Sequence, residues 1–227
     1  MPEKEYWDLY DRNRKPLGKR VVRDPNGHTQ IPPMAYHLVV ECVIVDKDRQ
    51  ILLTQRAPGV KHHAGYWECT TGSVMAGEDS LTGVHREVLE ETGLDFPLDQ
   101  FKLLRTIITD VVIRDIYVIC LDKINLCDVK VMEGETSAAT TLPFDTFLGI
   151  TRGACVAPDG TYMRLRGPQV SRLLNLFGQI EKTVSSGEKK KPGRKKKAEQ
   201  SKDSEKPAST FMDCTMEDLL ALGTGTI

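Results

Sequence analysis

The sequence lacks the features of membrane, secreted and zinc-binding proteins. No apolar run approaches the roughly 20 residues of a membrane-spanning helix, so no membrane contact is expected. The first five residues place no apolar stretch behind a basic one, so no secretory signal is expected. The six cysteines are scattered, with no two at metal-ligand spacing, which disfavours a zinc site or a disulfide framework. These absences predict a cytoplasmic protein in a reducing compartment.

Length and composition indicate one globular domain with appendages. A chain of 227 residues can bury one core of ordinary size but is short for two large domains. Hydrophobic residues make up 40% of the chain and charged residues 28%, a balance typical of globular proteins and not of disordered ones. Residues 1–35 are expected to be an N-terminal extension with a short edge strand and a turn over Tyr6–Arg23. Residues 36–184 are predicted to be the main domain.

Within residues 36–184, strand patterns alternate with helix patterns. His37–Val45 is rich in β-branched residues and is predicted to form a hairpin with Gln50–Gln55. A helix is expected to begin at a cap residue, Asp79 or Ser80, and to end at Gly93. The remaining predicted elements are two strands, Phe101–Ile108 and Val111–Leu121, and two helices, Leu142–Ile150 and Gly167–Val184. This order predicts an α/β or α+β fold, a mixed β-sheet sandwiched between helices.

Three carboxylates in the predicted helix point to chemistry. Glu87, Glu90 and Glu91 stand at positions i, i+3 and i+4, so they project from one helix face. Like charges at this spacing repel each other and gain nothing for the fold. Divalent cations with oxygen ligands remove that repulsion, and Mg²⁺ in particular is held by a few carboxylates, waters and phosphate oxygens. The pattern therefore favours a metal site over a solvated acidic helix.

Residues around this helix complete a longer pattern. Gly72 lies in the turn before the helix, where its carbonyl can approach a metal and nearby N–H groups can approach phosphate. Arg86 and Glu78 are eight residues apart and are predicted to pair, which would fix the turn on the helix. We assign this pair a structural role.

The window from Gly72 to Leu94 resembles a known motif, the Nudix box. It matches G-x5-E-x7-R-E-U-x-E-E-x-G-U, with U apolar, at every specified position. The resemblance implies a Nudix fold and hydrolysis of a nucleoside diphosphate linked to another moiety, with Mg²⁺ or Mn²⁺. It also implies that Glu87, Glu90 and Glu91 are metal ligands, that Gly72 adds its carbonyl, and that Glu87 orients or deprotonates the attacking water.

Other candidates for the site come from the flanking segments. Nudix sites often contain a further acidic residue from a later loop, for which Glu133 and Glu135 are the candidates. Arg56 follows a strand and could contact a substrate phosphate through its planar donor fork, or form a surface ion pair. Trp67 could stack on a base or belong to the core. Arg56, Trp67 and Glu135 are taken as candidate substrate-binding residues.

Flanking residues also raise a different reaction. The segments beginning at Trp7, Thr54 and Tyr66 are similar to the Nudix subgroup that contains isopentenyl-diphosphate isomerase. That isomerase has a cysteine just before the motif glycine and a histidine just after it, where this chain has Thr71 and Ser73. Cys69 is two residues too early, and His28 and His37 lack a third histidine for a metal site. Hydrolysis is therefore favoured over isomerisation.

The C-terminal residues offer a second class of function. Residues 185–227 are predicted to be a disordered basic linker followed by a short helix from Thr215, because apolar residues almost disappear after Ser185. Lys189–Lys197 places basic residues on both sides of Pro-Gly, which allows weak contact with DNA or another polyanion. The alternative function is a Nudix-fold binding or regulatory module tethered by this tail. Substrate identity and oligomeric state stay open, because selectivity is expected to come from loops without a diagnostic pattern: Ala57–Tyr66, Asp128–Thr141 and Arg152–Tyr162.

Overall fold

The computed structural model describes residues 4–148, 150, 154–157, 159–173 and 175. The chain divides into two compact units, residues 1–170 and 171–227, and the fold below is that of the first. Its elements are two 3₁₀ turns, Leu98–Gln100 and Leu126–Asp128, and the following strands and helices: β1 (Tyr6–Tyr10), β2 (Pro16–Val22), β3 (His37–Asp46), β4 (Gln50–Arg56), β5 (Trp67–Glu68), β6 (Thr70–Ser73), α1 (Ser80–Thr92), β7 (Lys102–Thr109), β8 (Val112–Leu121), β9 (Thr136–Pro143), α2 (Phe144–Leu148), β10 (Ala154–Val156) and β11 (Tyr162–Arg164).

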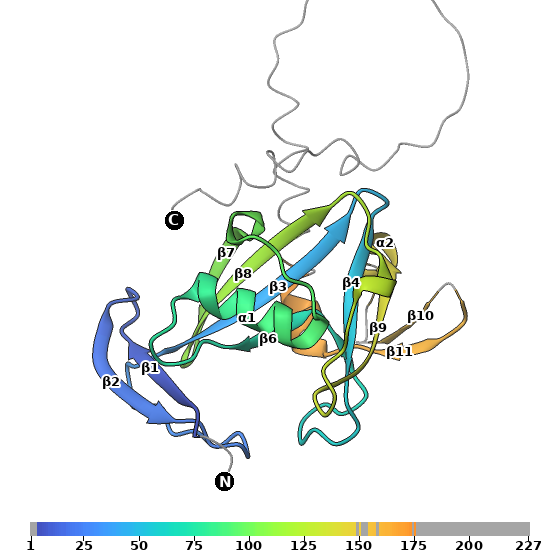
Figure 1. The fold of residues 1–227 in the computed structure, drawn as a ribbon. Helices are drawn as coiled ribbons and strands as arrows, with labels where there is room; N and C mark the ends of the chain where they lie inside the picture. The colour runs from blue at the N-terminus through green and yellow to red at the C-terminus, as the bar shows by residue number, and fades with distance from the viewer. Residues whose placement is uncertain (1–3, 149, 151–153, 158, 174, 176–227) are drawn as a thin grey trace, which may run out of the picture. The chain divides into compact units, whose positions relative to one another are not determined.

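A mixed sheet forms the centre of the domain (Figure 1). Its strand order in the described residues is β5-β4-β3-β8-β7, with β6 paired to β3 and β9 paired to β4. Strands β3 and β8 run parallel over ten residue pairs, from His37 beside Val112 to Asp46 beside Leu121. The predicted mixed α/β fold is confirmed. No helix in the described part of the chain is long and apolar enough to span a membrane.

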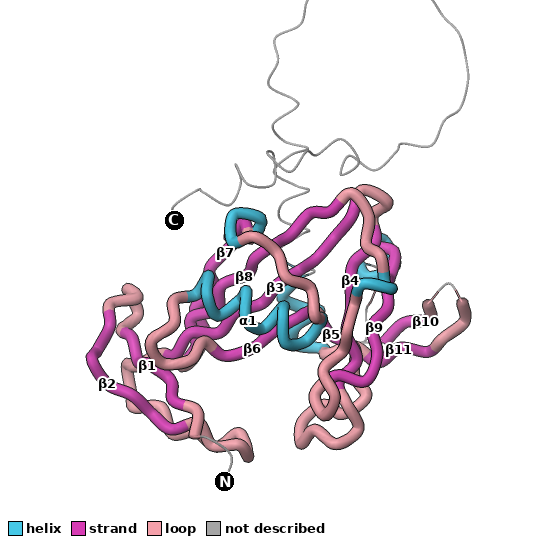
Figure 2. Tube along the Cα trace, viewed as in Figure 1, coloured by secondary structure: helices cyan, strands magenta, loops and turns pink. Residues whose placement is uncertain are grey.

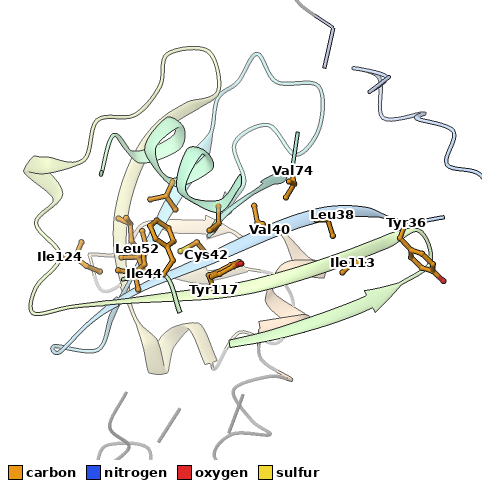
Figure 3. Close-up of a cluster of buried hydrophobic side chains, with 14 residues drawn as sticks. Tyr36, Leu38, Val40, Cys42, Ile44, Leu52, Val74, Ile113, Tyr117 and Ile124 are labelled. Carbon is orange, nitrogen blue, oxygen red and sulfur yellow. The ribbon is translucent and has the colours of Figure 1, made fainter. Parts of the chain in front are cut away.

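The core lies between β3 and α1. Strand β3 is buried along almost its whole length, as expected for a near-continuous apolar strand that is covered on both faces. Its side chains at Leu38, Val40, Cys42 and Ile44 project into one apolar cluster, shown in Figure 3. Helix α1 adds Val84 and Val88 to the same cluster, both fully buried. Glu87 and Glu91 lie next to this apolar stripe on the helix, and Glu91 is buried with it.

The ends of α1 are set by local sequence. The Asp79 side chain accepts a hydrogen bond from the Thr82 backbone N–H at 2.7 Å, and Gly93 ends the helix in the left-handed conformation with φ of 68°. These are the cap and terminator that the sequence predicts. Gly83 lets the helix approach β6, because a Cβ at this position would lie 2.9 Å from Cγ2 of Val74. The Asp79 cap and the close packing of Gly83 on Val74 set the position of α1, and with it the position of its acidic residues.

Three predicted segments differ from the structure (Figure 2). Tyr6–Arg23 is not one edge strand with a turn but the antiparallel hairpin of β1 and β2, a separate two-stranded sheet. Leu142–Ile150 is not one helix, because β9 extends through Pro143 and α2 has only five residues. Part of the predicted loop Asp128–Thr141 is strand β9, which pairs with β4 from Gln50 to Arg56. Pairing between distant segments overrides the weak local preference in the last two cases.

Two predicted regions lie wholly or partly outside the described residues. Residues 167–173 are helical, in agreement with the start of the helix predicted at Gly167–Val184, and most of its remainder is outside the description. Residues 185–227, with the basic segment Lys189–Lys197, lie outside it entirely.

The N-terminal hairpin is attached to the domain through a buried carboxylate. Arg14, at the turn of the hairpin with φ of 64°, binds both carboxylate oxygens of Asp115, one at 2.9 Å. Asp115 is 1% exposed and also accepts hydrogen bonds from Thr106 and Ser80. Backbone hydrogen bonds between Tyr10 and Tyr36 add to this attachment. The hairpin is therefore held against the same end of α1 that carries the helix cap.

His37 joins the hairpin to the sheet as a neutral side chain. Its ring stacks on the Trp7 indole, with ring centroids 4.1 Å apart and planes at 6°. Burial, with a smaller effect from the Arg114 charge, lowers the pKa of His37 to about 4. His37 is therefore a buried packing residue between Trp7 and the sheet in this structure.

Substituting His37 should change how stability depends on pH. Between pH 6.5 and 4 the unfolded chain protonates at His37 while the folded chain does not, so stability is lost as pH falls through this window. We expect wild type to lose about 1–2 kcal/mol more than His37→Phe between pH 7.5 and pH 5. Urea denaturation of both proteins at the two pH values measures the difference. Equal losses in the two proteins would show that His37 does not titrate in this way.

Candidate active site

A cavity of about 380 Å³ lies beside the acidic face of α1. The acidic face of α1, strands β5 and β6 and the end of β4 form its inner wall, and the segments before β1, after β2, after β4 and before β9 form its outer part. Its lining residues are Glu5, Arg23, Pro25, Thr54, Arg56, Gly59, Val60, Lys61, His62, Glu68, Thr71, Gly72, Ser73, Met75, Arg86, Glu87, Glu90, Glu91, Gly134, Glu135 and Thr136. The cavity thus gathers the motif residues of α1 and β6 with residues far away in the sequence.

Arg86 is the centre of the charged contacts. Its Nε and Nη2 donate to the two carboxylate oxygens of Glu78, at 2.8 and 3.1 Å. Its Nη1 donates to Glu87 at 2.8 Å and to Glu90 at 2.9 Å, and Nη2 also donates to the carbonyl of Ser73. The sequence predicts the Glu78 contact but not the two contacts within α1. One guanidinium therefore joins the turn before α1 to its acidic face.

Gly72 provides the space in which Glu87 lies. A Cβ added to Gly72 would be 1.9 Å from Cδ of Glu87, so no other residue fits without displacing that carboxylate. Burial raises the pKa of Glu87 to about 7; the Arg86 charge opposes this rise, and Glu90 and Glu135 add to it. The glycine of the motif is thus required by close packing against the carboxylate, in addition to any contact of its carbonyl.

Glu91 is a buried carboxylate with an unpaired oxygen. The residue is 8% exposed, and its Oε2 has no hydrogen-bond partner. Burial raises the pKa of Glu91 well above its usual range, and the charges of Glu68 and Glu87 raise it further. A buried, unsatisfied oxygen among other carboxylates is costly to the fold, and a divalent cation is the partner that offsets such a cost.

The donor set suits a hard cation in chemistry and position. Glu87, Glu90 and Glu91 all line the cavity, and Gly72 lines it beside them. As the side chains stand in the described part of the chain, no three acidic, histidine or cysteine residues are grouped closely enough to hold a metal. The Arg86 contacts explain this, because its guanidinium lies between Glu87 and Glu90. A cation at this site would require those two carboxylates to turn from Arg86.

Glu68 is a site residue that the sequence does not reveal. It is 2% exposed and binds Arg56 at 2.8 Å through one oxygen and Arg166 at 2.9 Å through the other. Arg56 also donates to the backbone carbonyl of His62. No local spacing links Glu68 to these arginines, so no sequence signal could have found the cluster. Arg56 does line the cavity, as its predicted substrate contact requires, but its charge is already paired.

Of the other two predicted substrate-binding residues, one lines the cavity and one does not. Glu135 lines the cavity, whereas Glu133 is not among its lining residues. Trp67 is 8% exposed and is absent from the lining, in line with its interpretation as a core residue. Tyr66 is also absent from the lining, and its ring and hydroxyl contact Arg164.

Cys69 is enclosed and unreactive. Its thiol is buried, and burial raises its pKa well above the usual range. Gln169 holds the backbone of Cys69 on both sides, with its Oε1 accepting from the N–H at 2.9 Å and its Nε2 donating to the carbonyl at 2.8 Å. A thiol in this environment is a poor acid or nucleophile.

Comparisons with known proteins agree with the position of the motif. Residues 35–145 match the family model described as NUDIX domain. Nudix hydrolase 2 of Arabidopsis thaliana is 29% identical over 126 residues, which cover 55% of this chain and 45% of the relative. An isopentenyl-diphosphate Delta-isomerase of Pectobacterium atrosepticum is 36% identical over 87 residues, which cover 38% of this chain and 46% of the relative. This chain therefore spans less than half the length of the curated relatives it matches.

A solved structure supports the fold alone. The crystal structure of DR0079 from Deinococcus radiodurans aligns with a TM-score of 0.50 and 17% identity, over 63% of this chain and 86% of the other.

Replacing Gly72 by alanine should destabilise the domain through Glu87. The new methyl group would overlap the Glu87 carboxylate, so we expect Gly72→Ala to lower the free energy of unfolding by about 1–3 kcal/mol. The loss should shrink in a Glu87→Ala background, because the overlapping group is then absent. Gly59→Ala is the matched control, since a Cβ there meets nothing within 4 Å. Chemical denaturation of the four proteins measures the coupling, and an equal loss in both backgrounds would contradict the packing argument.

Proposed function

Since residues 35–145 of this chain are a Nudix domain, we propose that the chain is a hydrolase that cleaves a diphosphate linkage with Mg²⁺ or Mn²⁺. The observation that supports this most is that three carboxylates of α1 line one cavity. One of them, Glu91, has a buried oxygen without a hydrogen-bond partner. Nucleoside diphosphates linked to another moiety, the substrates that the motif implies, are the first compounds to test.

Each site residue then has a separate task. Glu87, Glu90 and Glu91, with the carbonyl of Gly72, would hold the cation. When bound, the cation neutralises diphosphate oxygens and lowers the pKa of an attacking water. The Glu87 carboxylate accepts a proton from that water, since it is packed against Gly72 and faces the cavity. Arg86 and Glu78 keep the turn before α1 in place, so that Gly72 stays beside Glu87.

Arg56 and Glu135 act on the substrate side of the cavity in this proposal. Arg56 is held by Glu68, which fixes the direction of its guanidinium toward the inner wall and lowers its conformational cost of binding a phosphate. Glu135 approaches from the segment before β9, and its charge already acts on Glu87. Its position in the lining and its charge effect on Glu87 support a role as a further ligand of the cation.

Removing a single carboxylate charge should abolish turnover without unfolding the domain. We expect Glu90→Gln and Glu91→Gln to lower kcat roughly 100-fold or more, because each removes a cation ligand. Glu91→Gln should also raise stability in a chelator by about 1 kcal/mol, because a carboxyl whose pKa is raised by burial must take up a proton on folding near neutral pH, which the amide need not do. Detection of the phosphomonoester products from a panel of diphosphates, coupled to a phosphatase, and urea denaturation in EDTA measure the two effects. Full turnover in both variants would refute the proposed cation site, and binding without turnover by wild type would favour the regulatory module.

The isomerase alternative depends on Cys69, because no other cysteine lies near the motif glycine in the sequence. Its burial and its Gln169 clamp favour hydrolysis. We expect Cys69→Ala to keep turnover within about twofold of wild type, as for an inert buried thiol. An assay of isopentenyl diphosphate for both phosphate release and isomerisation checks this. Loss of an isomerase activity in Cys69→Ala would establish the alternative.

A further inference from the structure

The outer part of the cavity is built by two segments that are distant in the sequence. Residues 23–27, after β2, meet the loop of residues 57–66, after β4. The Lys61 ammonium donates to Oδ1 of Asn26 at 2.6 Å. The His62 ring packs over Gly27, where an added Cβ would lie 3.1 Å from Nε2, and Gly27 has φ of 80°. Gly27 thus serves both the turn and the contact with His62. The two contacts hold the two segments of the outer wall together.

The two segments give the outer wall a different charge from the inner wall. The inner wall contains the acidic residues of α1, whereas the outer wall contributes Arg23 and Lys61. Arg23 is paired with Glu5, and both side chains are partly exposed, at 48% and 38%. The inner arginines Arg56 and Arg86 are also in ion pairs. Lys61 instead donates to a neutral amide, and the carboxylate its charge acts on, Asp24, does not line the cavity, so among these cations Lys61 is the one best able to bind an anion there.

The lining of the cavity also limits what it can bind. In the part of the chain that the structure describes, no phenylalanine, tyrosine or tryptophan lines this cavity. Tyr66 and Trp67 are close in sequence to the lining residues, but the Tyr66 ring contacts Arg164 and Trp67 is buried in the core. Recognition of a nucleobase commonly uses a tyrosine, phenylalanine or tryptophan platform, and the one aromatic ring among the described lining residues is the His62 imidazole, which packs against Gly27.

We propose that the outer wall, through Lys61 with Arg23, binds a further phosphate group at the end of the substrate away from the scissile diphosphate. The proposal rests on the proposed diphosphate hydrolysis and departs from the nucleoside diphosphates that the motif implies: it names small diphosphates with a distal phosphate and no stacked base as the substrate class. Lys61 acts as a compact point charge for the phosphate. Glu5 lies on the same wall and competes with the phosphate for Arg23.

Two substitutions of opposite effect test this charge arrangement. Lys61→Met removes the binding charge, and Glu5→Gln removes the competing one. Lys47→Met is the matched control, because Lys47 is 77% exposed and pairs with Asp122, neither of which lines the cavity. The probes are 5-phosphoribosyl 1-diphosphate, which has a distal phosphate, and isopentenyl diphosphate, which does not. For each probe, KM and kcat with Mg²⁺ and the calorimetric Kd are measured on the full chain.

The expected pattern is specific to the phosphorylated probe. Lys61→Met should raise its KM and Kd about tenfold with little change in kcat, the loss expected for one charge-assisted contact. Glu5→Gln should lower both constants a few-fold, as expected when a competing charge is removed. Isopentenyl diphosphate and the Lys47→Met control should show neither effect.

The outcomes separate this inference from the proposed function. If wild type releases phosphate but Lys61→Met affects both probes equally or neither, the outer phosphate site is refuted and the hydrolase proposal stands. If wild type cleaves no diphosphate, the hydrolase proposal fails. The calorimetric Kd of phosphoribosyl diphosphate then judges the outer site by itself, and an unchanged Kd in Lys61→Met overturns it.

Discussion

The contacts of one guanidinium, that of Arg86, are what the rest of the site depends on. Arg86 binds Glu78 on the turn before α1 and binds Glu87 and Glu90 on the helix itself. Like charges on one helix face repel each other, and the guanidinium reduces that repulsion between Glu87 and Glu90. The same contact holds the turn in place, which keeps Gly72 against the Glu87 carboxylate. Helix packing, the turn and the acidic face are therefore coupled through a single side chain.

The scaffold around this contact is rigid where the site needs it. Strand β3 is buried along nearly its full length and its parallel partner β8 through its middle, and β3 supports both β6 and α1. Asp115 of β8 binds Arg14, Thr106 and Ser80, so one carboxylate attaches the N-terminal hairpin, β7 and the start of α1 to the same strand. This attachment brings Glu5 and Arg23 to the cavity. An N-terminal segment that reads as an extension is in this way part of the cavity wall.

The sequence predicts those features that depend on residues close together in the chain. The helix from Asp79 to Gly93 and the pair of Arg86 with Glu78 follow from spacing within one short window, so both are predictable. Strand β9 is not, because its short Ala-Thr run is selected by pairing with β4 more than 80 residues earlier. The role of Glu68 depends on its ion pairs with Arg56 and Arg166, and the position of Lys61 depends on its hydrogen bond to Asn26 on a different segment. Such contacts have no signature at fixed spacing, so only the folded chain reveals them.

The central claim is that the carboxylates of α1 form a cation site beside Gly72. Crystals of the protein soaked in Mn²⁺ would test it directly by anomalous scattering, because Mn²⁺ is a close substitute for Mg²⁺ at oxygen sites. The account predicts an anomalous peak within ligand distance, about 2.1–2.3 Å, of carboxylate oxygens of Glu87, Glu90 and Glu91, with Arg86 still bound to Glu78. A peak bound elsewhere, or no peak at this face while the protein hydrolyses a diphosphate with Mn²⁺, would contradict it.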